Sequence, residues 1–292
     1  MFWKTQNGIV FTKRLEINVV HHCNLVCRGC SHLSPYLPKY FISPDKLRIE
    51  LSALYRSCRP ERVSLIGGEP LLHPNLTRIF QVVRNSGITK KIRVVTNGLL
   101  LSRMSDSFWK AIDELHVSFY PIHQMKKLDL DVIQYRAKKS GINFVLRYQD
   151  YFSESFLKVS NNDDTLVRKI YRTCSASKEA CCHTLYDGYY YKCPKSVSIP
   201  LSYQDRYIGD VVQNGIRILG NNRFAHDLIG YLSSDDPLDA CRYCLGSVGK
   251  RFKPEQIRKQ KLAPDFSPEK LIDYKRSEKL EKNKGIPLPH FI

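Results

Sequence analysis

The stretch that decides the fold is Cys23-Asn24-Leu25-Val26-Cys27-Arg28-Gly29-Cys30, which follows the apolar run Leu15–Val20. Its spacing, C-x3-C-x2-C, lets one short loop present three thiolates. Thiolate is the ligand that iron–sulfur clusters prefer, and a ferredoxin-type cube ordinarily takes four. Three thiolates leave one iron without a protein ligand, and an open position is typical of catalytic metals. The loop therefore predicts a [4Fe-4S] cluster, with half a zinc site or a redox pair as plainer alternatives.

A second motif, Gly67-Gly68-Glu69-Pro70, ends the next strand candidate, at residues 62–66. Two adjacent glycines permit the backbone to approach a ligand closely, and a carboxylate beside them accepts a hydrogen bond from an ammonium group. On its own the tetrapeptide indicates only a turn. Its separation from the cysteine loop fits one βα unit, which favours a joint role for the two motifs.

The cysteine loop and the glycine motif together resemble those of the radical SAM superfamily. The resemblance implies that the open iron chelates S-adenosylmethionine (SAM), and that electron transfer into the sulfonium yields a 5′-deoxyadenosyl radical that abstracts hydrogen from substrate. It also implies that Gly67, Gly68 and Glu69 hold the SAM amino group. The family usually carries an aromatic residue just before the third cysteine, packed on the adenine, whereas this chain has Gly29 there.

Three further residues are expected to contact SAM. Asn97 and Ser118 stand at strand ends where the resembled family often contacts the SAM ribose or carboxylate. Arg147, which closes the fifth strand candidate, is expected to meet the SAM carboxylate or an anionic substrate. The plainer alternatives are strand-end caps for Asn97 and Ser118, and a solvent-facing side chain for Arg147.

The hydrophobic pattern of the first half alternates short β-branched runs with helical segments, which predicts βα units and a parallel sheet. We expect an α/β fold: a partial (β/α)6 TIM-like radical SAM barrel over residues 1–160, a small Cys-rich twitch- or SPASM-like domain over 161–252, and a basic tail over 253–292. In such barrels the chemistry lies at the C-terminal ends of the strands. The expected strands are Leu15–Val20, Arg62–Ile66, Ile92–Thr96, Glu114–Phe119 and Asn143–Arg147, and the expected helices lie near Asp45–Arg56, Leu76–Asn85, Ser107–Ile112 and Asp129–Lys139.

A second set of cysteines lies between residues 174 and 244. Cys241 and Cys244 form a C-x2-C pair, and with Cys174 and Cys193 they make four thiolates, enough to close a second cluster. The segment around Cys193 resembles the hairpin that carries a ligand in the SPASM and twitch extensions of radical SAM enzymes, which implies one fully ligated auxiliary [4Fe-4S] cluster. A structural zinc held by four cysteines is the alternative.

Several cysteines and one histidine near these motifs have no assigned role. Cys181 and Cys182 are not needed in either ligand set, and three roles stay open for them: buried packing residues, substitute ligands, or a thiol that donates hydrogen. Cys58 is interpreted as a core residue in a helical stretch, and His32 as a packing residue beside the metal loop. No catalytic residue is assigned from the sequence.

Composition limits the setting in which the protein works. The 292 residues include no apolar stretch of 18 or more, so no membrane partner is expected, and the opening residues lack the apolar region of a secretory signal. Ten cysteines without such a signal indicate reduced thiols and a cytoplasmic location. The net charge of +18 is either a solubility feature or a match for an anionic ligand. No nucleic-acid partner is expected, because no recognition pattern is present.

The predicted function is reductive SAM cleavage and hydrogen abstraction from a small polar substrate, with an anionic one among the options. The favoured outcome is dehydrogenation of a carbohydrate, cyclitol or activated sugar, with electrons supplied by a protein such as flavodoxin or ferredoxin. The alternatives are a peptide-modifying SPASM-type maturase and a radical epimerase. Outside enzymes, the alternative is a basic, zinc-stabilised nucleic-acid binder.

Overall fold

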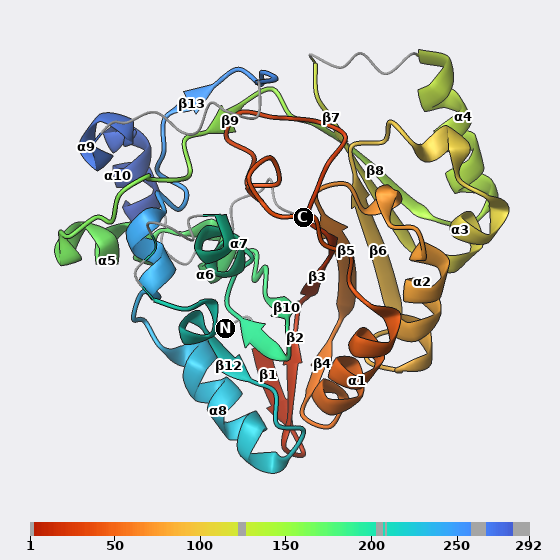
Figure 1. The fold of residues 1–292 in the computed structure, drawn as a ribbon, viewed down its shortest axis with the longest axis horizontal. Helices are drawn as coiled ribbons and strands as arrows, with labels where there is room; N and C mark the ends of the chain where they lie inside the picture. Colours follow the sequence, from red (N-terminus) through yellow and green to blue (C-terminus); the bar gives the residue numbers. More distant parts are fainter. Residues whose placement is uncertain (1–2, 122–126, 203–206, 208, 258–266, 283–292) are drawn as a thin grey trace.

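The computed structural model describes residues 3–121, 127–202, 207, 209–257 and 267–282. Its centre is an eight-stranded sheet in the order β12-β11-β10-β3-β5-β6-β7-β8 (Figure 1). Neighbours from β10 through β3 to β8 pair in parallel, and β11 and β12 are added antiparallel at one edge. The sheet strands are β3 (Leu15–Val20), β5 (Arg62–Gly67), β6 (Lys91–Thr96), β7 (Glu114–Phe119), β8 (Asn143–Tyr148), β10 (Thr184–Tyr186), β11 (Tyr189–Tyr191) and β12 (Gly215–Arg217). All five strands expected from the sequence are confirmed.

Helices alternate with the parallel strands and lie beside the β5–β8 half of the sheet in Figure 1, as right-handed βα crossovers require. They are α1 (Pro44–Tyr55), α2 (Leu76–Asn85), α3 (Asp106–Ala111) and α4 (Lys127–Lys139). The Ser43 side chain caps α1 by accepting from the Lys46 amide at 3.5 Å, and Pro44 occupies the first helical position. The main core packs fully buried strand residues such as Leu65 and Leu115 with helix residues such as Leu51. This confirms the α/β fold with a parallel-rich sheet.

The face of the sheet opposite these helices carries buried charge near the N-terminal ends of the strands. Arg93 lies 2.6 Å from Glu114 on the neighbouring strand, and both side chains are nearly inaccessible to solvent. Burial lowers the pKa of His116 to about 3, helped by nearby Arg93 and Arg147. Arg93, Glu114 and His116 are positioned three or more residues before the C-terminal ends of their strands. The opposite end of the sheet is therefore left for the cysteine loop.

Shorter elements complete the described part of the chain. A three-stranded sheet joins β1 (Trp3–Gln6), β2 (Ile9–Thr12) and β4 (Cys58–Pro60). Cys58 is thus in a strand and not in a helix as expected; its place in the core is confirmed, since it is fully buried. The remaining elements are η1 (Pro70–Leu72), η2 (Leu101–Arg103), β9 (Phe152–Ser153), α5 (Asp164–Arg172), α6 (Ser175–Lys178), α7 (Lys195–Ser202), η3 (Val211–Asn214), α8 (Asn222–Ser233), η4 (Asp239–Tyr243), β13 (Arg251–Phe252), α9 (Pro268–Leu271) and α10 (Tyr274–Lys282).

Much of the described C-terminal region packs against the rest of the molecule. Leu271, Ile272 and Leu280, which lie within the expected tail, are buried in an apolar cluster with Leu157 and Leu245. Strand β13 pairs antiparallel with β9. The sheet also runs through the expected boundary at residue 160, because β10 joins β3; the domain limits themselves stay a prediction.

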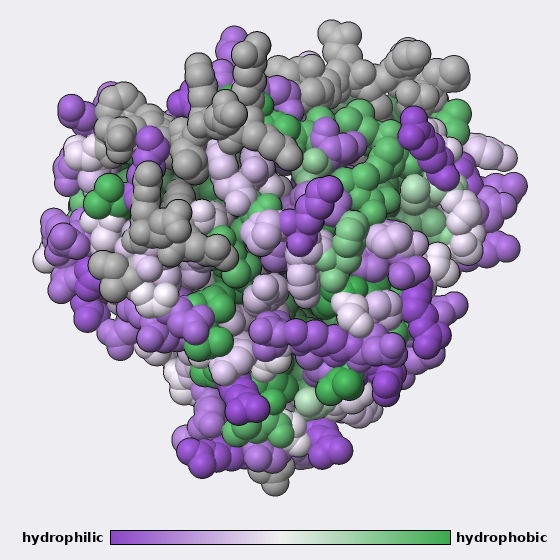
Figure 2. All heavy atoms as spheres, in the orientation of Figure 1, coloured by the Kyte–Doolittle hydropathy of each residue, from purple (hydrophilic) through white to green (hydrophobic). Residues whose placement is uncertain are grey.

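On the face shown in Figure 2, hydrophilic residues dominate the periphery and hydrophobic residues are visible mainly toward the centre. None of the described helices has the length and apolar character needed to cross a bilayer.

Candidate functional site

The cysteine loop leaves the C-terminal end of β3, where α/β barrels place their chemistry. Burial raises the pKa of Cys23 to about 12 and that of Cys27 to about 11, and neighbouring Cys30 adds to both shifts. The mutual effect means that the three thiols lie close together. Cys23 and Cys27 are therefore protonated without metal, and iron binding replaces their protons. The donor set fits three corners of a [4Fe-4S] cluster.

The glycine motif lies directly against the chain segment that leads into this loop. A Cβ on Gly67 would lie 2.0 Å from the Val20 oxygen, and a Cβ on Gly68 would lie 2.0 Å from the His22 oxygen. The backbone is held there by the Gly68 amide, which donates to Val20 O at 2.8 Å, and by the Glu69 amide, which donates to His22 O at 3.1 Å. The glycines thus permit a close approach of two segments of the protein itself.

The Glu69 carboxylate is fully buried and points into the protein. It accepts hydrogen bonds from Thr96 Oγ1 at 2.6 Å, the Asn97 amide at 2.8 Å and the Leu71 amide at 3.1 Å. Burial raises its pKa to about 6, although these three bonds act in the opposite direction. In the described structure the carboxylate therefore ties the end of β5 to the end of β6. Its contact with the SAM amino group stays a prediction.

The other expected SAM residues lie around the same end of the sheet. Asn97 Nδ2 donates to Asn24 Oδ1 at 2.7 Å and approaches Cys23 Sγ at 3.7 Å, so this side chain contacts the cysteine loop. Ser118 and Arg147 are directly paired in the register of β7 and β8. Burial and nearby Arg14 lower the pKa of Arg147, and Cys182 acts in the opposite direction, so the side chain of Arg147 interacts with residues at the N-terminal end of the sheet rather than with the cysteine loop.

Sequence reasoning missed Tyr120, which follows β7. Burial raises the pKa of Tyr120, and so do the neighbouring thiols of Cys27 and Cys30. Its ring lies 5.5 Å from that of Phe152, which in turn lies 6.3 Å from Phe252. The sequence feature that could have identified Tyr120 is its position directly after a barrel strand, at the end where the chemistry is expected.

Sequence reasoning also missed the segment from Arg251 to Ile257, which we call the strap. Phe252 fills the space beside Gly29: a Cβ on Gly29 would lie 2.6 Å from the Phe252 ring, and Gly29 has φ +64°. The Arg28 guanidinium lies over the same ring at 4.3 Å. The position where the resembled family usually has an aromatic is thus packed by an aromatic from the far end of the chain.

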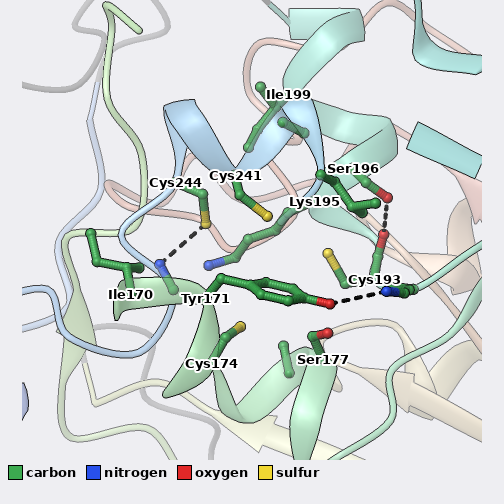
Figure 3. Close-up of a pocket in the computed structure, with 15 residues that line it drawn as sticks. Ile170, Tyr171, Cys174, Ser177, Cys193, Lys195, Ser196, Ile199, Cys241 and Cys244 are labelled. Atoms are coloured by element: carbon green, nitrogen blue, oxygen red, sulfur yellow. Dashed lines mark hydrogen bonds between the residues drawn. The ribbon is translucent and has the colours of Figure 1, made fainter. Parts of the chain in front are cut away.

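The second set of cysteines meets in one cavity, shown in Figure 3. Cys174 precedes α6, Cys193 follows β11, and Cys241 and Cys244 come from η4 and its end. Burial raises the pKa of Cys193 to about 12, and Cys174 and Cys244 add to the shift. The four expected auxiliary ligands are therefore brought together from three separate segments.

Two lysines, Lys192 and Lys195, line this cavity, and the amino group of Lys195 interacts with three of its thiols. Burial alone would lower the pKa of Lys195, but Cys244, Cys174 and Cys193 raise it overall. Within the described ranges, no group of three or more His, Cys, Asp or Glu side chains is gathered for a single metal ion. The thiols instead line the walls of a shared space, which fits a larger group whose corners each take one thiolate.

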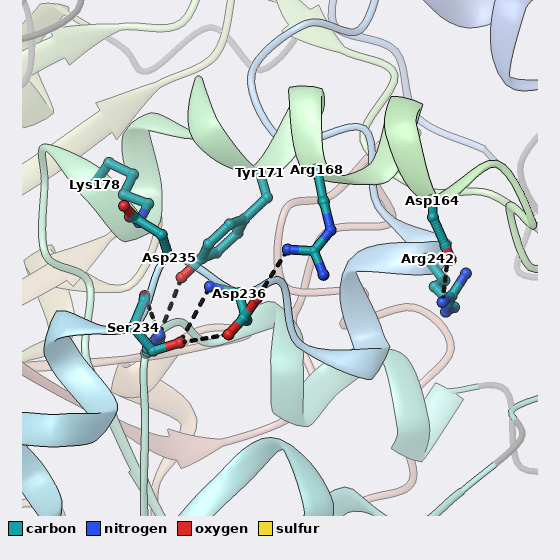
Figure 4. Close-up of polar contacts among 9 residues, drawn as sticks. Asp164, Arg168, Tyr171, Lys178, Ser234, Asp235, Asp236 and Arg242 are labelled. Carbon is teal, nitrogen blue, oxygen red and sulfur yellow. Dashed lines mark hydrogen bonds and ion pairs between the residues drawn. The ribbon is translucent and has the colours of Figure 1, made fainter.

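Ion pairs fix the segments around this cavity (Figure 4). Arg168 on α5 lies 2.8 Å from Asp236, Arg242 on η4 lies 2.6 Å from Asp164, and Lys178 lies 2.6 Å from Asp235. Exposed pairs of this kind contribute little to stability, because water screens the charges. They orient α5 and η4 more than they stabilise the fold.

Cys181 and Cys182 precede β10 at the N-terminal end of the sheet, away from the first cysteine loop. Cys182 nevertheless lies near Cys193 of the second set, which adds to the effect of burial in raising the pKa of Cys182. Arg14 Nη1 lies 3.8 Å from Cys182 Sγ, and Cys182 also contacts Glu16. Glu16 stands four residues, or about 13 Å along the strand, before the end of β3, and the cysteine loop begins beyond that end. Cys181 is buried and its thiol approaches the Glu179 oxygen. Both thiols thus belong to the N-terminal end of the sheet.

A small cavity separates the glycine motif from α7. His21, His32, Ser34 and Ser198 line it, and each has one buried polar atom that lacks a hydrogen-bond partner among the described residues. Burial lowers the pKa of His21 and of His32 to about 4, so both rings are neutral at pH 7. The cavity offers hydrogen-bonding groups without charge.

Comparison with known proteins adds the family. Residues 17–124 match the model of the Radical SAM superfamily. The chain is 30% identical over 101 residues to GTP 3',8-cyclase of Trichodesmium erythraeum, covering 33% of this chain and 31% of that protein. It is 29% identical over 168 residues to GTP 3',8-cyclase of Aquifex aeolicus, covering 53% and 51%. The chain therefore spans about a third to a half of the length of these curated relatives.

Among solved structures, BtrN in complex with AdoMet and 2-DOIA matches with a TM-score of 0.44 and 16% identity, over 80% of this chain and 92% of that chain.

Proposed function

Taking as premise that residues 17–124 are a radical SAM domain, we propose that this protein cleaves SAM reductively and dehydrogenates a small polar substrate. Cys23, Cys27 and Cys30 would hold the first [4Fe-4S] cluster, and Cys174, Cys193, Cys241 and Cys244 a second. When bound, the first cluster and SAM supply a radical that abstracts hydrogen from a C–H bond. The protein's own residues supply binding, orientation and exclusion of water.

The observation that carries the dehydrogenase proposal is the single cavity lined by four thiols and two lysines, Lys192 and Lys195. Removal of one hydrogen atom leaves a substrate radical, which must still lose an electron and a proton to become a ketone. A fully ligated cluster is suited to accept that electron, because all its irons have protein ligands and none is open to SAM. Four thiolates add negative charge to this site, and the ammonium of Lys195 offsets part of it.

The proposed SAM site is formed by the C-terminal strand ends. Gly67, Gly68 and Glu69 would hold the amino group, and Asn97, Ser118 and Arg147 the ribose or carboxylate. The Glu69 carboxylate supports this through its three hydrogen bonds, which fix the backbone at the ends of β5 and β6. Close packing of the glycines on residues 20–22 sets the distance between this site and the cysteine loop.

The uncharged groups around the cavity beside α7 favour a neutral hydroxylated substrate such as a carbohydrate or cyclitol at this end of the sheet, although the cavity itself, about 10 Å³, has room for no more than a water molecule. Neutral His21 and His32 and the hydroxyls of Ser34 and Ser198 both donate and accept hydrogen bonds. A radical epimerase that uses Cys181 or Cys182 as hydrogen donor is the alternative, and its substrate would have to reach the N-terminal end of the sheet, where Arg14 and Glu16 contact Cys182. A flavodoxin- or ferredoxin-type protein in a reducing cytoplasm would supply the electron for SAM cleavage.

A nucleoside triphosphate is the second candidate substrate. The curated relatives are named GTP 3',8-cyclases, and the net charge of +18 favours polyanions. Peptide modification, the other alternative, has no specific observation in its favour.

Iron analysis after anaerobic reconstitution tests the proposal. We expect about eight irons per chain for two cubes. Alanine at Cys23, Cys27 and Cys30 together should remove about half of the iron and abolish SAM cleavage, whereas alanine at Cys174, Cys193, Cys241 and Cys244 should remove the other half. SAM cleavage that persists in the first variant would end the radical SAM mechanism.

Product analysis then separates the substrates. Wild-type protein is incubated with SAM and a reductant, and with cyclitols, sugars, GTP or peptides in turn. A ketone with two hydrogens fewer than the substrate supports dehydrogenation. A cyclised nucleotide or a modified peptide as the product would instead favour the corresponding alternative function over dehydrogenation.

A further inference from the structure

The strap seats on the cysteine loop through backbone and side-chain contacts. Ile257 N donates to Val26 O at 2.8 Å, and Arg28 N donates to Glu255 O at 3.0 Å. The Arg28 guanidinium also lies 3.0 Å from Glu255. About 230 residues of sequence separate the two segments, so this contact is a product of the tertiary fold.

Gln256 is the strap residue that reaches a cysteine sulfur. Its Oε1 accepts a hydrogen bond from the Val26 amide at 2.6 Å, and its Nε2 donates to Cys27 Sγ at 3.0 Å. The backbone amide of Val26 is a donor, which fixes the oxygen of the side chain on that side. The NH₂ group must therefore face the sulfur.

A donor at this sulfur has an electronic consequence once Cys27 is an iron ligand. Reduction adds negative charge to the cluster and its thiolates, and an N–H group aimed at a sulfur stabilises that charge. Hydrogen bonds to the sulfurs are among the factors that set the reduction potential of iron–sulfur clusters. Cys23 receives a comparable contact from the Leu25 amide at 3.4 Å, but that donor belongs to the loop itself.

We propose that Gln256 is a positioning residue that sets the reduction potential of the first cluster through its hydrogen bond to Cys27. The proposal rests on the proposed function only in requiring a cluster at Cys23, Cys27 and Cys30. Through this contact the C-terminal region adjusts how readily the cluster accepts the electron that SAM cleavage needs.

The test is a redox titration of the reconstituted protein, followed by electron paramagnetic resonance. The variant Gln256→Leu keeps the size of the side chain and removes the donor. We expect about a ten-fold shift of the one-electron equilibrium toward the oxidised form, which corresponds to a potential lower by about 59 mV. The second cluster serves as an internal control, because its potential should not move. Gln81→Leu, the same change on the exposed surface of α2, is the matched control.

The second variant is Gln256→Glu, which keeps an oxygen for the Val26 amide and places an acceptor at the sulfur. The reduction potential of its first cluster should fall at least as far as that of Gln256→Leu. If Gln256→Leu assembles no first cluster, the potential of Gln256→Glu alone tests the proposal. Unchanged potential in either loaded variant would overturn the proposal. So would failure of both variants to assemble the first cluster, because Gln256 would then act only in assembly. A wild-type protein that forms no cluster at the three cysteines would instead refute the proposed function.

Discussion

Replacing Gly68 by alanine tests whether close packing of the glycine motif holds the cysteine loop in place. The added Cβ would lie 2.0 Å from the His22 oxygen, 2.3 Å from its carbon and 2.5 Å from the His21 oxygen. To reach an ordinary contact of 3.4 Å, the backbone before Cys23 must move by about 1.4 Å. All three neighbouring atoms are backbone, so no side-chain rotation relieves the clash.

The energetic cost follows from the bonds that such a movement breaks. The Gly68 amide donates to Val20 O and the Glu69 amide to His22 O, and Glu69 is fully buried. A buried polar group left without its partner costs about 1 to 3 kcal/mol, and overpacking costs a similar amount. We therefore expect Gly68→Ala to lower the free energy of unfolding by about 2 to 4 kcal/mol.

Urea denaturation of the apo protein, followed by circular dichroism, measures this loss. The reconstituted variant should also hold fewer irons, because the loop that carries Cys23 is displaced. Gly230→Ala on α8 is the matched control: no atom lies within 4 Å of its added Cβ. Alanine in an open helical position should be neutral or stabilise by about 0.5 to 1 kcal/mol. Gly68→Ala with the stability and iron content of Gly230→Ala would refute the packing argument.

Three further predictions follow from the same structure. Glu69→Gln should weaken SAM binding about ten-fold in calorimetric titration with unchanged iron content, since an amide cannot accept from all three donors that the carboxylate serves; undiminished affinity would contradict this role. Single Cys→Ala changes at Cys181 and Cys182 should leave iron content and most turnover intact, because both thiols lie at the N-terminal end of the sheet; loss of product with intact clusters, and solvent deuterium in wild-type product, would favour epimerisation. The buried His116 has its pKa lowered to about 3, so the unfolded chain takes up a proton first as pH falls from 6.5 toward 3, and stability is lost in that window. His116→Gln should reduce the dependence of the free energy of unfolding on pH by up to about 1.4 kcal/mol per pH unit, measured by urea titrations of the apo protein at several pH values. An unaltered pH dependence would show that His116 is not its source.

The sequence predicted those parts of the molecule that depend on local pattern. Alternating runs such as Leu15–Val20 and Glu114–Phe119 are strands because β-branched and apolar residues recur over one strand length. The cysteine loop and the glycine motif were placed at strand ends for the same reason. Cys58 was misplaced in a helix because its strand is only three residues long and pairs with a distant one.

The expected auxiliary ligands were predicted from the sequence in part, and the structure added the rest of their surroundings. Cysteine count and the C-x2-C pair suggested four thiols in one site, and the structure brings Cys174, Cys193, Cys241 and Cys244 around one cavity. The two lysines among them were not predicted, because nothing in the local pattern distinguishes Lys192 and Lys195 from surface lysines.

By itself, the sequence determined the α/β fold, the radical SAM motifs and the candidate ligands, since each depends on residue type and short spacing. Only the tertiary structure decided that Glu69 points inward, that the glycines pack on residues 20–22, and that Phe252 and Gln256 contact the cysteine loop. Those contacts join residues from about 30 to 230 positions apart. Such pairs leave no periodicity in the chain, because they form only when burial of the apolar core brings the segments together.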